Sequence, residues 1–299
     1  MMRFLPNTLM QMTNELRHFG ARVVPTCSGK GKTLTISCFS SLFAHCRQLF
    51  ASLSKMSKGN SKPFTIFVEG NIGSGKTTFL KHFAALDNVV TLAEPVDRWR
   101  EVRGENFLDL MYSDPSRWGI TFQTYVQLTM LDLHTKPVER PIKMMERSIH
   151  SARYCFVENL HSSGLMPNPD FIALDEWFNW ILKNHDVAGN LIIYLRTTPE
   201  VVHKRMLSRA RTEESCVPLD YLQKLHQFHE DWLYHRKSFN CPAPVLVIDA
   251  DKDLEMMAAD FLTCEAKISD AVANLGKQRN VSSPSKMNLS SPIKVPSLS

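Results

Sequence analysis

One short segment constrains the fold of this chain more than any other. Residues 70–77 read Gly-Asn-Ile-Gly-Ser-Gly-Lys-Thr, which matches the pattern G-x-x-x-x-G-K-[ST], and an apolar run directly precedes them. The pattern works only between a strand and a helix, because phosphate is bound by successive backbone N–H groups and by the helix N-terminus. The sequence therefore predicts a nucleotide site in an α/β fold, comprising Gly70, Asn71, Ile72, Gly73, Ser74, Gly75, Lys76, Thr77 and Thr78.

The rest of the central region carries the pattern of alternating strands and helices. Short β-branched runs alternate with longer stretches of helical periodicity. The runs are nearly continuous in apolar residues, as expected of strands covered on both faces. The chain thus predicts one doubly wound, five-stranded parallel sheet flanked by helices. The expected strands are 64–69, 89–93, 142–146, 191–195 and 245–249, and the expected helix faces include Phe122, Val126, Met130 and Leu133, and then Leu254, Met257, Phe261, Ile268 and Leu275.

The charge of the chain is unevenly distributed. The net charge is +5, but residues 1–58 carry +7 and residues 276–299 carry +4, which leaves −6 for the region between them. An acidic central region argues against a nucleic-acid partner. No run of eighteen apolar residues occurs, so we expect no membrane partner. The seven scattered cysteines form no C-x-x-C pair, which indicates reduced thiols.

The composition divides the chain into three parts. Residues 1–61 are rich in Ser, Thr and Arg and hold a single acid, Glu15, which is typical of a mitochondrial transit peptide. Two alternatives stay open: a disordered leader, or an extension ahead of a second start at Met56 that would leave a cytoplasmic or nuclear protein. Residues 62–275 form the expected domain, and residues 276–299 are a Ser/Pro/Lys-rich tail that we expect to be disordered.

Three further patterns narrow the chemistry. The guanine-reading N-K-x-D motif is absent from the sequence, which argues against a GTPase. Glu94 follows the second expected strand, and the pair Glu146-Arg147 ends the third, at the sheet edge where α/β proteins bind ligands. Alone, each could be a helix-start carboxylate or a surface ion pair. Arg205, Arg209 and Arg211 repel one another unless an anion lies between them, so they predict a lid that closes on a triphosphate; a solvated helix face is the alternative.

Taken together, many segments in order resemble one family. They include IFVEGNIGSGKTT, EPVDRW, MYSDPSRW, FQTYVQLTML, ERSIHSARYCFVEN, YLRTTPE, RARTEESCVPLDYL and HEDWL. This combination resembles the deoxyribonucleoside kinase family, and within it the branch of insect multisubstrate enzymes and mitochondrial thymidine kinases. The resemblance covers roughly residues 62–260 and implies a P-loop kinase with a lid segment, which phosphorylates deoxyribonucleosides at the 5′ position in nucleotide salvage.

The resemblance implies a role for each residue of the phosphate end. Glu94 would be the general base for the 5′-hydroxyl, with Arg147 steadying its carboxylate and the developing charge, and Lys76 reaching the transferred phosphate. Thr77 and Glu146 would hold Mg²⁺. Such roles suit phosphoryl transfer, whose catalysis is mostly positioning and charge stabilisation. ATP would be bound by Arg205, Arg209 and Arg211, with Asp249 and Asp251 in the loop near adenine.

The resemblance also implies a nucleoside pocket. Gln123 would pair with the pyrimidine edge, because an amide donates and accepts at once. Phe156 would stack on the base, Trp99 and Phe122 would close its other side, and Tyr112 and Glu214 would hold the 3′-hydroxyl. Val126, Met130 and Ala152 would line the far end, which favours thymidine and deoxycytidine, with purine deoxynucleosides poorer. A homodimer and feedback by a deoxynucleoside triphosphate are further implications.

Other functions fit the residues less well. A thymidylate-type monophosphate kinase needs a cation where this chain has Glu94, and another thymidine kinase class needs four zinc-binding cysteines. A nucleotide-sensing module would need no Glu94, Gln123, Tyr112 and Glu214 together. His226 and His229 lie three residues apart, but without a third ligand a solvated helix face is expected rather than a metal site.

Overall fold

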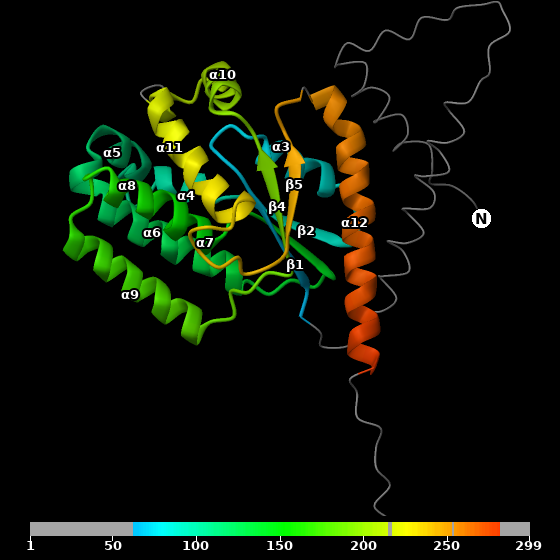
Figure 1. Ribbon diagram of the computed structural model, residues 1–299. Coiled ribbons are helices and arrows are strands. Elements are labelled where there is room, and N and C mark those ends of the chain that lie inside the picture. The colour runs from blue at the N-terminus through cyan, green and yellow to red at the C-terminus, as the bar shows by residue number, and fades with distance from the viewer. Residues whose placement is uncertain (1–61, 215–216, 253, 282–299) are drawn as a thin grey trace, which may run out of the picture. The chain divides into compact units, whose positions relative to one another are not determined.

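A five-stranded sheet forms the centre of the fold. The computed structural model describes residues 62–214, 217–252 and 254–281. All its strands are parallel, in the order β2-β3-β1-β4-β5 (Figure 1). The chain moves from β1 to one side and later crosses to the other, so the strand order reverses at β1, where ligands bind in such sheets. The strands are β1 (Phe64–Glu69), β2 (Val89–Leu92), β3 (Ile142–Glu146), β4 (Leu191–Arg196) and β5 (Val245–Asp249).

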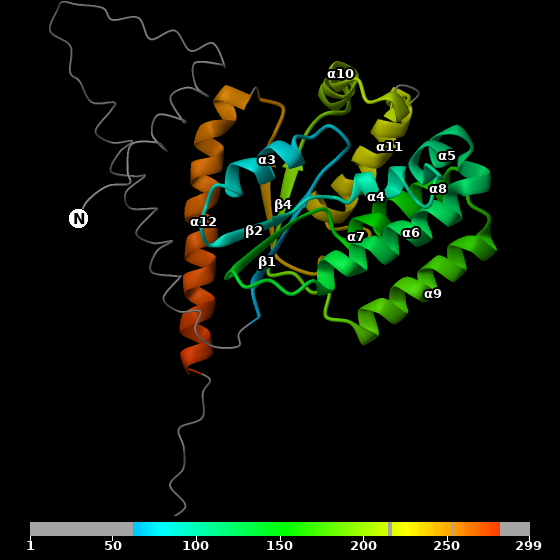
Figure 2. The same ribbon diagram turned by 180° about the vertical axis from the view of Figure 1, so that it is seen from behind.

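The predicted fold class is confirmed, with one-residue differences at the ends of β2 and β4. Helices cover both faces of the sheet, as Figures 1 and 2 show from opposite sides. One face carries α3 (Lys76–Phe83) and α12 (Leu254–Val281). The elements on the other side or near the strand ends are α4 (Val96–Arg100), α5 (Phe107–Ser113), α6 (Pro115–Thr135), α7 (Ile149–Ser151), η1 (Ala152–Val157), α8 (Glu158–Ser162), α9 (Asn168–Asn184), α10 (Pro199–Arg209), η2 (Thr212–Glu214), α11 (Leu219–His229) and η3 (Glu230–Tyr234).

Two apolar cores form because neighbouring residues of a strand face opposite ways. In β1, Ile66 and Val68 pack with α3 and α12, whereas Phe67 packs with the helices of the other side. All three side chains are fully buried, and each such burial contributes about 1.5–3 kcal/mol. This two-sided burial explains the continuous apolar runs. The edge strand β5 is the exception, since Val247 is exposed.

Helix α6 is the longest on the cavity side. It begins after Asp114, whose side chain accepts a hydrogen bond from the Arg117 amide, and Pro115 suits the first turn. Of the residues expected on one face, Phe122, Val126 and Met130 are buried and Leu133 is half-buried. Helix α12 starts where expected but continues past residue 275 to Val281. None of the described helices is long and apolar enough to cross a membrane.

The phosphate-binding loop is closed tightly against its neighbours. Gly70 and Gly73 have φ values of +145° and +80°, which side chains rarely adopt. A Cβ atom on Gly70 would lie 2.7 Å from the carbonyl oxygen of Leu195, and one on Gly73 would lie 2.8 Å from that of Val202. Both glycines are therefore required by conformation and by space, and they bring the loop against β4 and α10.

Candidate active site

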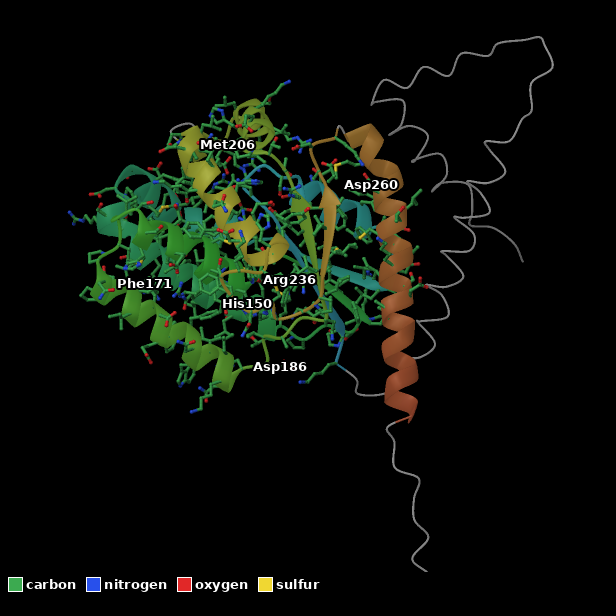
Figure 3. All side chains as sticks on the ribbon, in the orientation of Figure 1. His150, Phe171, Asp186, Met206, Arg236 and Asp260 are labelled. Atoms are coloured by element: carbon green, nitrogen blue, oxygen red, sulfur yellow. The ribbon has the colours of Figure 1, made fainter. Side chains whose placement is uncertain are left out.

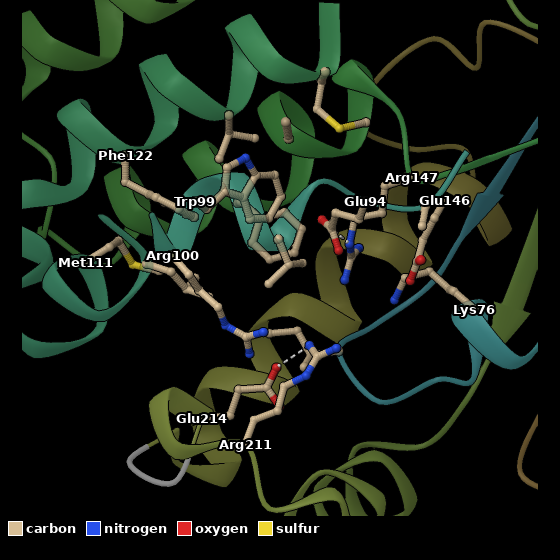
Figure 4. A pocket seen from close by; sticks show the side chains of 18 of the residues that line it. Lys76, Glu94, Trp99, Arg100, Met111, Phe122, Glu146, Arg147, Arg211 and Glu214 are labelled. Carbon is tan, nitrogen blue, oxygen red and sulfur yellow. Dashed lines mark hydrogen bonds and ion pairs between the residues drawn. The ribbon is translucent and has the colours of Figure 1, made fainter. Parts of the chain in front are cut away.

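A cavity of about 250 Å³ lies among the phosphate-binding loop, β2, β3 and the helices α4, α5, α6 and η1. Figure 4 shows Lys76, Glu94, Glu146 and Arg147 gathered at one end, with Trp99 and Phe122 at the other. The predicted site residues that line it are Ile72, Gly73, Lys76, Thr77, Glu94, Trp99, Tyr112, Phe122, Gln123, Val126, Met130, Glu146, Arg147, Ala152, Phe156, Arg209, Arg211 and Glu214.

A second cavity, of about 470 Å³, lies over the loop on the side of α10 and α12. Its lining includes Ser74, Gly75, Thr78 and Arg205, as expected of a phosphate and nucleotide site. The two cavities meet, because both are lined by Gly73, Lys76, Thr77, Glu146, Arg209 and Arg211.

At the phosphate end, an ion pair between the buried Arg147 and the half-buried Glu94 joins the ends of β2 and β3. Nε of Arg147 lies 3.1 Å from Oε1 of Glu94, and its Nη1 donates to the carbonyl of Gly70 at 2.9 Å. The guanidinium also lies 4.7 Å from the centre of the Phe156 ring. Burial raises the pKa of Glu94, opposed by the charge of Arg147. A carboxylate whose pKa is raised is a stronger base and is suited to accept a proton.

Lys76 and the oxygen ligands lie next to this pair. Nζ of Lys76 donates to the carbonyls of Gly70 and Asn71 at 3.2 and 2.7 Å, and burial, with the charge of Arg147, lowers its pKa. The Thr77 hydroxyl donates to Glu146 at 2.8 Å. Thr77 and Glu146 thus present two hard oxygen donors on one side of the loop, a set that fits Mg²⁺, which binds few protein ligands beside water and phosphate.

The other end of the cavity is mostly apolar with one polar group. Oε1 of Gln123 is buried and has no hydrogen-bond partner within the described protein. Trp99 packs edge-on against Phe122, with ring centres 5.5 Å apart, and its Nε1 donates to Thr129 at 2.9 Å. A buried, unpartnered acceptor is costly, and because Gln123 also lines the cavity, its acceptor is placed to bind a ligand.

The lid side is closed by charged and phenolic groups. Glu214 is buried and accepts hydrogen bonds from Arg209 and, at 3.1 Å, from Arg211. In this structure, the negative charge between Arg209 and Arg211 is therefore supplied by the Glu214 carboxylate, not by a triphosphate. Burial raises the pKa of Tyr112, and the nearby Tyr221 and Glu214 act in the same direction. The tyrosine stays a neutral hydroxyl that can donate to a ligand.

Several expected site residues lie elsewhere. Asp249 and Asp251 line neither cavity; Asp251 instead accepts hydrogen bonds from the amide and hydroxyl of Thr198, at the start of α10. Of the loop that contains these two aspartates, Lys252 lines the second cavity. Gly70 and Asn71 also lie outside both linings, and their carbonyls bind Lys76.

For Arg205 and His229, the structure does not show the solvated helix face that was considered. Arg205 is not a free cation on a solvated face, because its guanidinium donates to the carbonyls of Ala250 and Lys252 and ties α10 to this loop. His229 was expected on a solvated face but is fully buried. Its ring stacks on Tyr194, and its Nδ1 lies 2.6 Å from the carbonyl of Leu225.

Another group of cavity residues was not predicted from the sequence. The lining is completed by Ala93, Val96, Asp97, Arg100, Leu108, Met111, Ser148 and Tyr221. Their positions depend on how α4, α5 and α11 pack, which local patterns do not report. Ser148 donates to the fully buried Glu69 at 2.6 Å and accepts from the Ser151 amide, so it fixes the turn that follows Arg147. Burial raises the pKa of Glu69 to about 7.

Comparisons with known proteins agree with this geometry. A family model described as Deoxynucleoside kinase matches residues 66–274. The human protein Thymidine kinase 2, mitochondrial is 57% identical over 200 residues, which cover 67% of this chain and 76% of the relative; the Macaca fascicularis protein of that name is 54% identical over 208 residues, covering 70% and 78%. Human Deoxycytidine kinase is 36% identical over 220 residues, covering 64% and 85%. The chain belongs to the deoxynucleoside kinase family.

Proposed function

We propose that this chain transfers the γ-phosphoryl group of ATP to the 5′-hydroxyl of deoxyribonucleosides, with thymidine and deoxycytidine preferred. One observation carries the proposal: the cavity that ends in a buried, unpartnered Gln123 begins at the carboxylate of Glu94, beside the phosphate-binding loop. A carboxylate there repels a substrate that already carries a phosphate and attracts a neutral hydroxyl.

In the proposed reaction, Glu94 accepts the proton of the 5′-hydroxyl as its oxygen attacks the γ-phosphorus and the bond to the β-phosphate breaks. Arg147 holds that carboxylate in place at 3.1 Å and balances negative charge at the reacting oxygens. Lys76 exchanges its two backbone carbonyl partners for phosphate oxygens. These groups are held before substrate arrives, which is how phosphoryl transfer is mainly accelerated.

The donor would bind in the second cavity. Residues of the loop line that space together with Arg205, Arg209 and Arg211, and backbone N–H groups beside cationic side chains suit a triphosphate. Thr77 and Glu146 would hold Mg²⁺, which neutralises phosphate charge when bound.

Selection of the nucleobase would depend on the Gln123 amide and on the shape of the apolar end of the nucleoside cavity. The Gln123 amide can pair with thymine or cytosine, so it does not separate them. Phe156 would stack on the base, opposite Trp99 and Phe122. Tyr112 and Glu214 would bind the 3′-hydroxyl, and the Tyr112 ring would crowd a ribose 2′-hydroxyl. The names of the relatives, a thymidine kinase and a deoxycytidine kinase, support both pyrimidine substrates.

A coupled assay with ATP and Mg²⁺ tests this function. Thymidine and deoxycytidine should be converted efficiently, deoxyadenosine and deoxyguanosine less well, and the ribonucleosides poorly. Thymidine monophosphate serves as the opposing substrate. If it were the good substrate and thymidine were inert, the chain would be a monophosphate kinase and the proposal would fail.

We propose that the chain forms a homodimer through α6 and α9. These helices pack side by side and leave Leu128, Ile172, Trp177 and Trp180 exposed by 44–50%, with the two tryptophan rings stacked 5.1 Å apart. An exposed apolar patch of this kind marks an interface. Light scattering should give twice the chain mass, and Trp177→Lys with Trp180→Lys should give a monomer.

Two further proposals concern control and location. Because the two cavities share Gly73, Lys76, Arg209 and Arg211, a deoxynucleoside triphosphate could place its base against Gln123 and its phosphates on the loop, and so inhibit both substrates competitively. We propose a mitochondrial protein, supported by the names of the relatives and by the basic residues 1–58, which lie outside the described residues. A fluorescent protein fused to residues 1–58 should be found in mitochondria. Fluorescence in the cytosol or nucleus would instead favour a translation start at Met56.

A further inference from the structure

Two lid arginines are bound to a carboxylate that lies in the nucleoside cavity. Arg209 and Arg211 both donate to Glu214, one to each of its oxygens. Glu214 is 6% exposed, whereas the side chains of Arg209 and Arg211 are 35% and 31% exposed. Figure 4 shows Arg211 reaching Glu214 below the cavity. The carboxylate therefore has two cationic partners that remain accessible from the second cavity.

The backbone explains why two successive arginines reach one acid. Ala210, between them, has φ +52° and ends α10 in the left-handed conformation. The chain reverses there, so the side chains on either side of Ala210 converge instead of pointing to opposite sides. A non-glycine residue is strained in this conformation, and the double ion pair offsets the strain.

The neighbouring acid is bound on the opposite side. Glu213 accepts hydrogen bonds from Nε and Nη2 of Arg100, on α4, at 2.6 and 3.3 Å. This pair ties η2 to the wall of the nucleoside cavity independently of α10. Glu214 therefore keeps its place in the cavity when Arg209 and Arg211 leave it.

We infer that Glu214 exchanges partners during binding: donor phosphates draw Arg209 and Arg211 away, which frees the Glu214 carboxylate to accept the 3′-hydroxyl of the nucleoside. The inference rests on the proposed function, because it takes the second cavity as the donor site and Glu214 as the ligand of the 3′-hydroxyl. It adds that the two sites are coupled through one carboxylate, and that the coupling acts only on substrates with a 3′-hydroxyl.

The direction of the coupling follows from the hydrogen bonds. With both oxygens bound to guanidiniums, Glu214 is a weak acceptor for a neutral hydroxyl. Triphosphate oxygens carry more charge than a carboxylate and lie on the side to which the arginines are exposed, so they compete for the guanidiniums. Donor binding should therefore tighten nucleoside binding, and by linkage a nucleoside should tighten donor binding by the same factor.

Calorimetry on the whole chain tests the inference. The affinity of thymidine and of 3′-deoxythymidine is measured with and without the β,γ-imido analogue of ATP and Mg²⁺. We expect the analogue to tighten thymidine binding by about five- to tenfold or more. For 3′-deoxythymidine we expect a change below about twofold, because this ligand offers nothing to Glu214.

A variant gives a second, opposite readout. In Glu214→Gln the arginines lose their charged partner, so the ATP analogue alone should bind more tightly, by about threefold or more, and the coupling to thymidine should disappear. The matched control is Asp132→Asn, which breaks an exposed pair with Arg98 outside both cavities and should change neither value.

The outcomes separate the inference from the function on which it rests. Equal coupling for thymidine and 3′-deoxythymidine, or weaker analogue binding in Glu214→Gln, would overturn the exchange while leaving the kinase proposal intact. Failure of thymidine or of the analogue to bind the wild-type chain would overturn both.

Discussion

Arg147 adopts φ +62°, a left-handed conformation that costs a non-glycine residue about 1–2 kcal/mol. The strain persists because its guanidinium is held on three sides, by Glu94, by the Gly70 carbonyl and by the face of Phe156. Backbone strain of this kind is common where a side chain must be aimed at reacting atoms. In our proposal, the strained backbone at Arg147 directs its guanidinium toward the general base, Glu94.

Gln123 supplies the clearest single-residue test of the base pocket. Gln123→Met keeps volume but removes both hydrogen bonds to the base, which are each worth about 0.5–1.5 kcal/mol. We expect kcat/KM for thymidine to fall by roughly 10- to 100-fold, measured by the coupled assay.

Gln127 offers a matched control on the same helix. It lies one turn after Gln123, is fully buried, and lies outside the cavity lining. Gln127→Met should leave kcat/KM for thymidine within about twofold. If both variants lost activity equally, Gln123 would be a core residue and its role in base binding would be wrong.

The site residues differed in how far the sequence alone could predict them. The phosphate-binding loop was found from its own pattern, because its chemistry depends on adjacent backbone groups. Gln123 and Glu94 came from a resemblance of many segments, since one amide or acid in a sequence carries little information. Tyr221 and Arg100 were missed, and the contact of Asp251 with Thr198 was not foreseen, because such side-chain contacts are set by packing between distant elements.

At the scale of elements, helix α6 serves the core and the cavity at once. Val126 and Met130 are 6% and 1% exposed, belong to the large apolar core, and also line the cavity. The alternatives of core residue and pocket residue are therefore both true of this stripe. Substrate breadth should depend on these side chains, because Gln123 does not discriminate between thymine and cytosine.

Enlarging this end of the cavity should admit larger bases. Val126→Ala with Met130→Ala removes volume that would collide with the second ring of a purine. Pocket changes of this size shift relative transition-state binding by about 1–3 kcal/mol, so kcat/KM for deoxyguanosine relative to thymidine should rise roughly tenfold or more. An unchanged ratio between the two enzymes would assign both side chains to the core alone.

The helices show where periodicity succeeds and where it stops. The spacing of apolar residues predicted α6 and the start of α12 correctly, because the buried face of a helix requires apolar residues every three or four positions. The end of α12 was missed by six residues, since polar residues continue a helix without an apolar signal. His229 was wrongly assigned to a solvated face, because a polar side chain in a helix gives no sign of the aromatic ring that covers it.

At the scale of the whole molecule, buried neutral histidines couple folding to pH. Burial lowers the pKa of His150 to about 4 and that of His229 to about 3, from 6.5. The unfolded chain therefore binds more protons than the folded chain below pH 6.5. The contribution of these two rings to stability is full above pH 6.5 and is lost as the pH falls toward 4, by about 2–3 kcal/mol for each ring.

His150 isolates this effect. It packs against Phe67, Tyr154 and Phe178 in the interior, where Figure 3 labels it. His150→Phe keeps a ring but cannot be protonated, so the free energy of unfolding should fall by about 1–2 kcal/mol less between pH 7 and 5 than in the wild-type chain. His235→Phe, at an exposed position, is the control. Identical pH dependence in all three proteins, measured by urea unfolding, would contradict the assignment.

The central claim is that Glu94 receives the proton of a neutral 5′-hydroxyl. Glu94→Gln keeps the shape but removes the acceptor, so the most direct measurement is its kcat together with its Kd for thymidine. We predict that kcat falls by roughly 10²- to 10⁴-fold while Kd changes little. Glu101→Gln, an exposed acid after α4, is the control. A Glu94→Gln enzyme with a kcat near the wild-type value would reduce Glu94 to a partner of Arg147 and contradict the account.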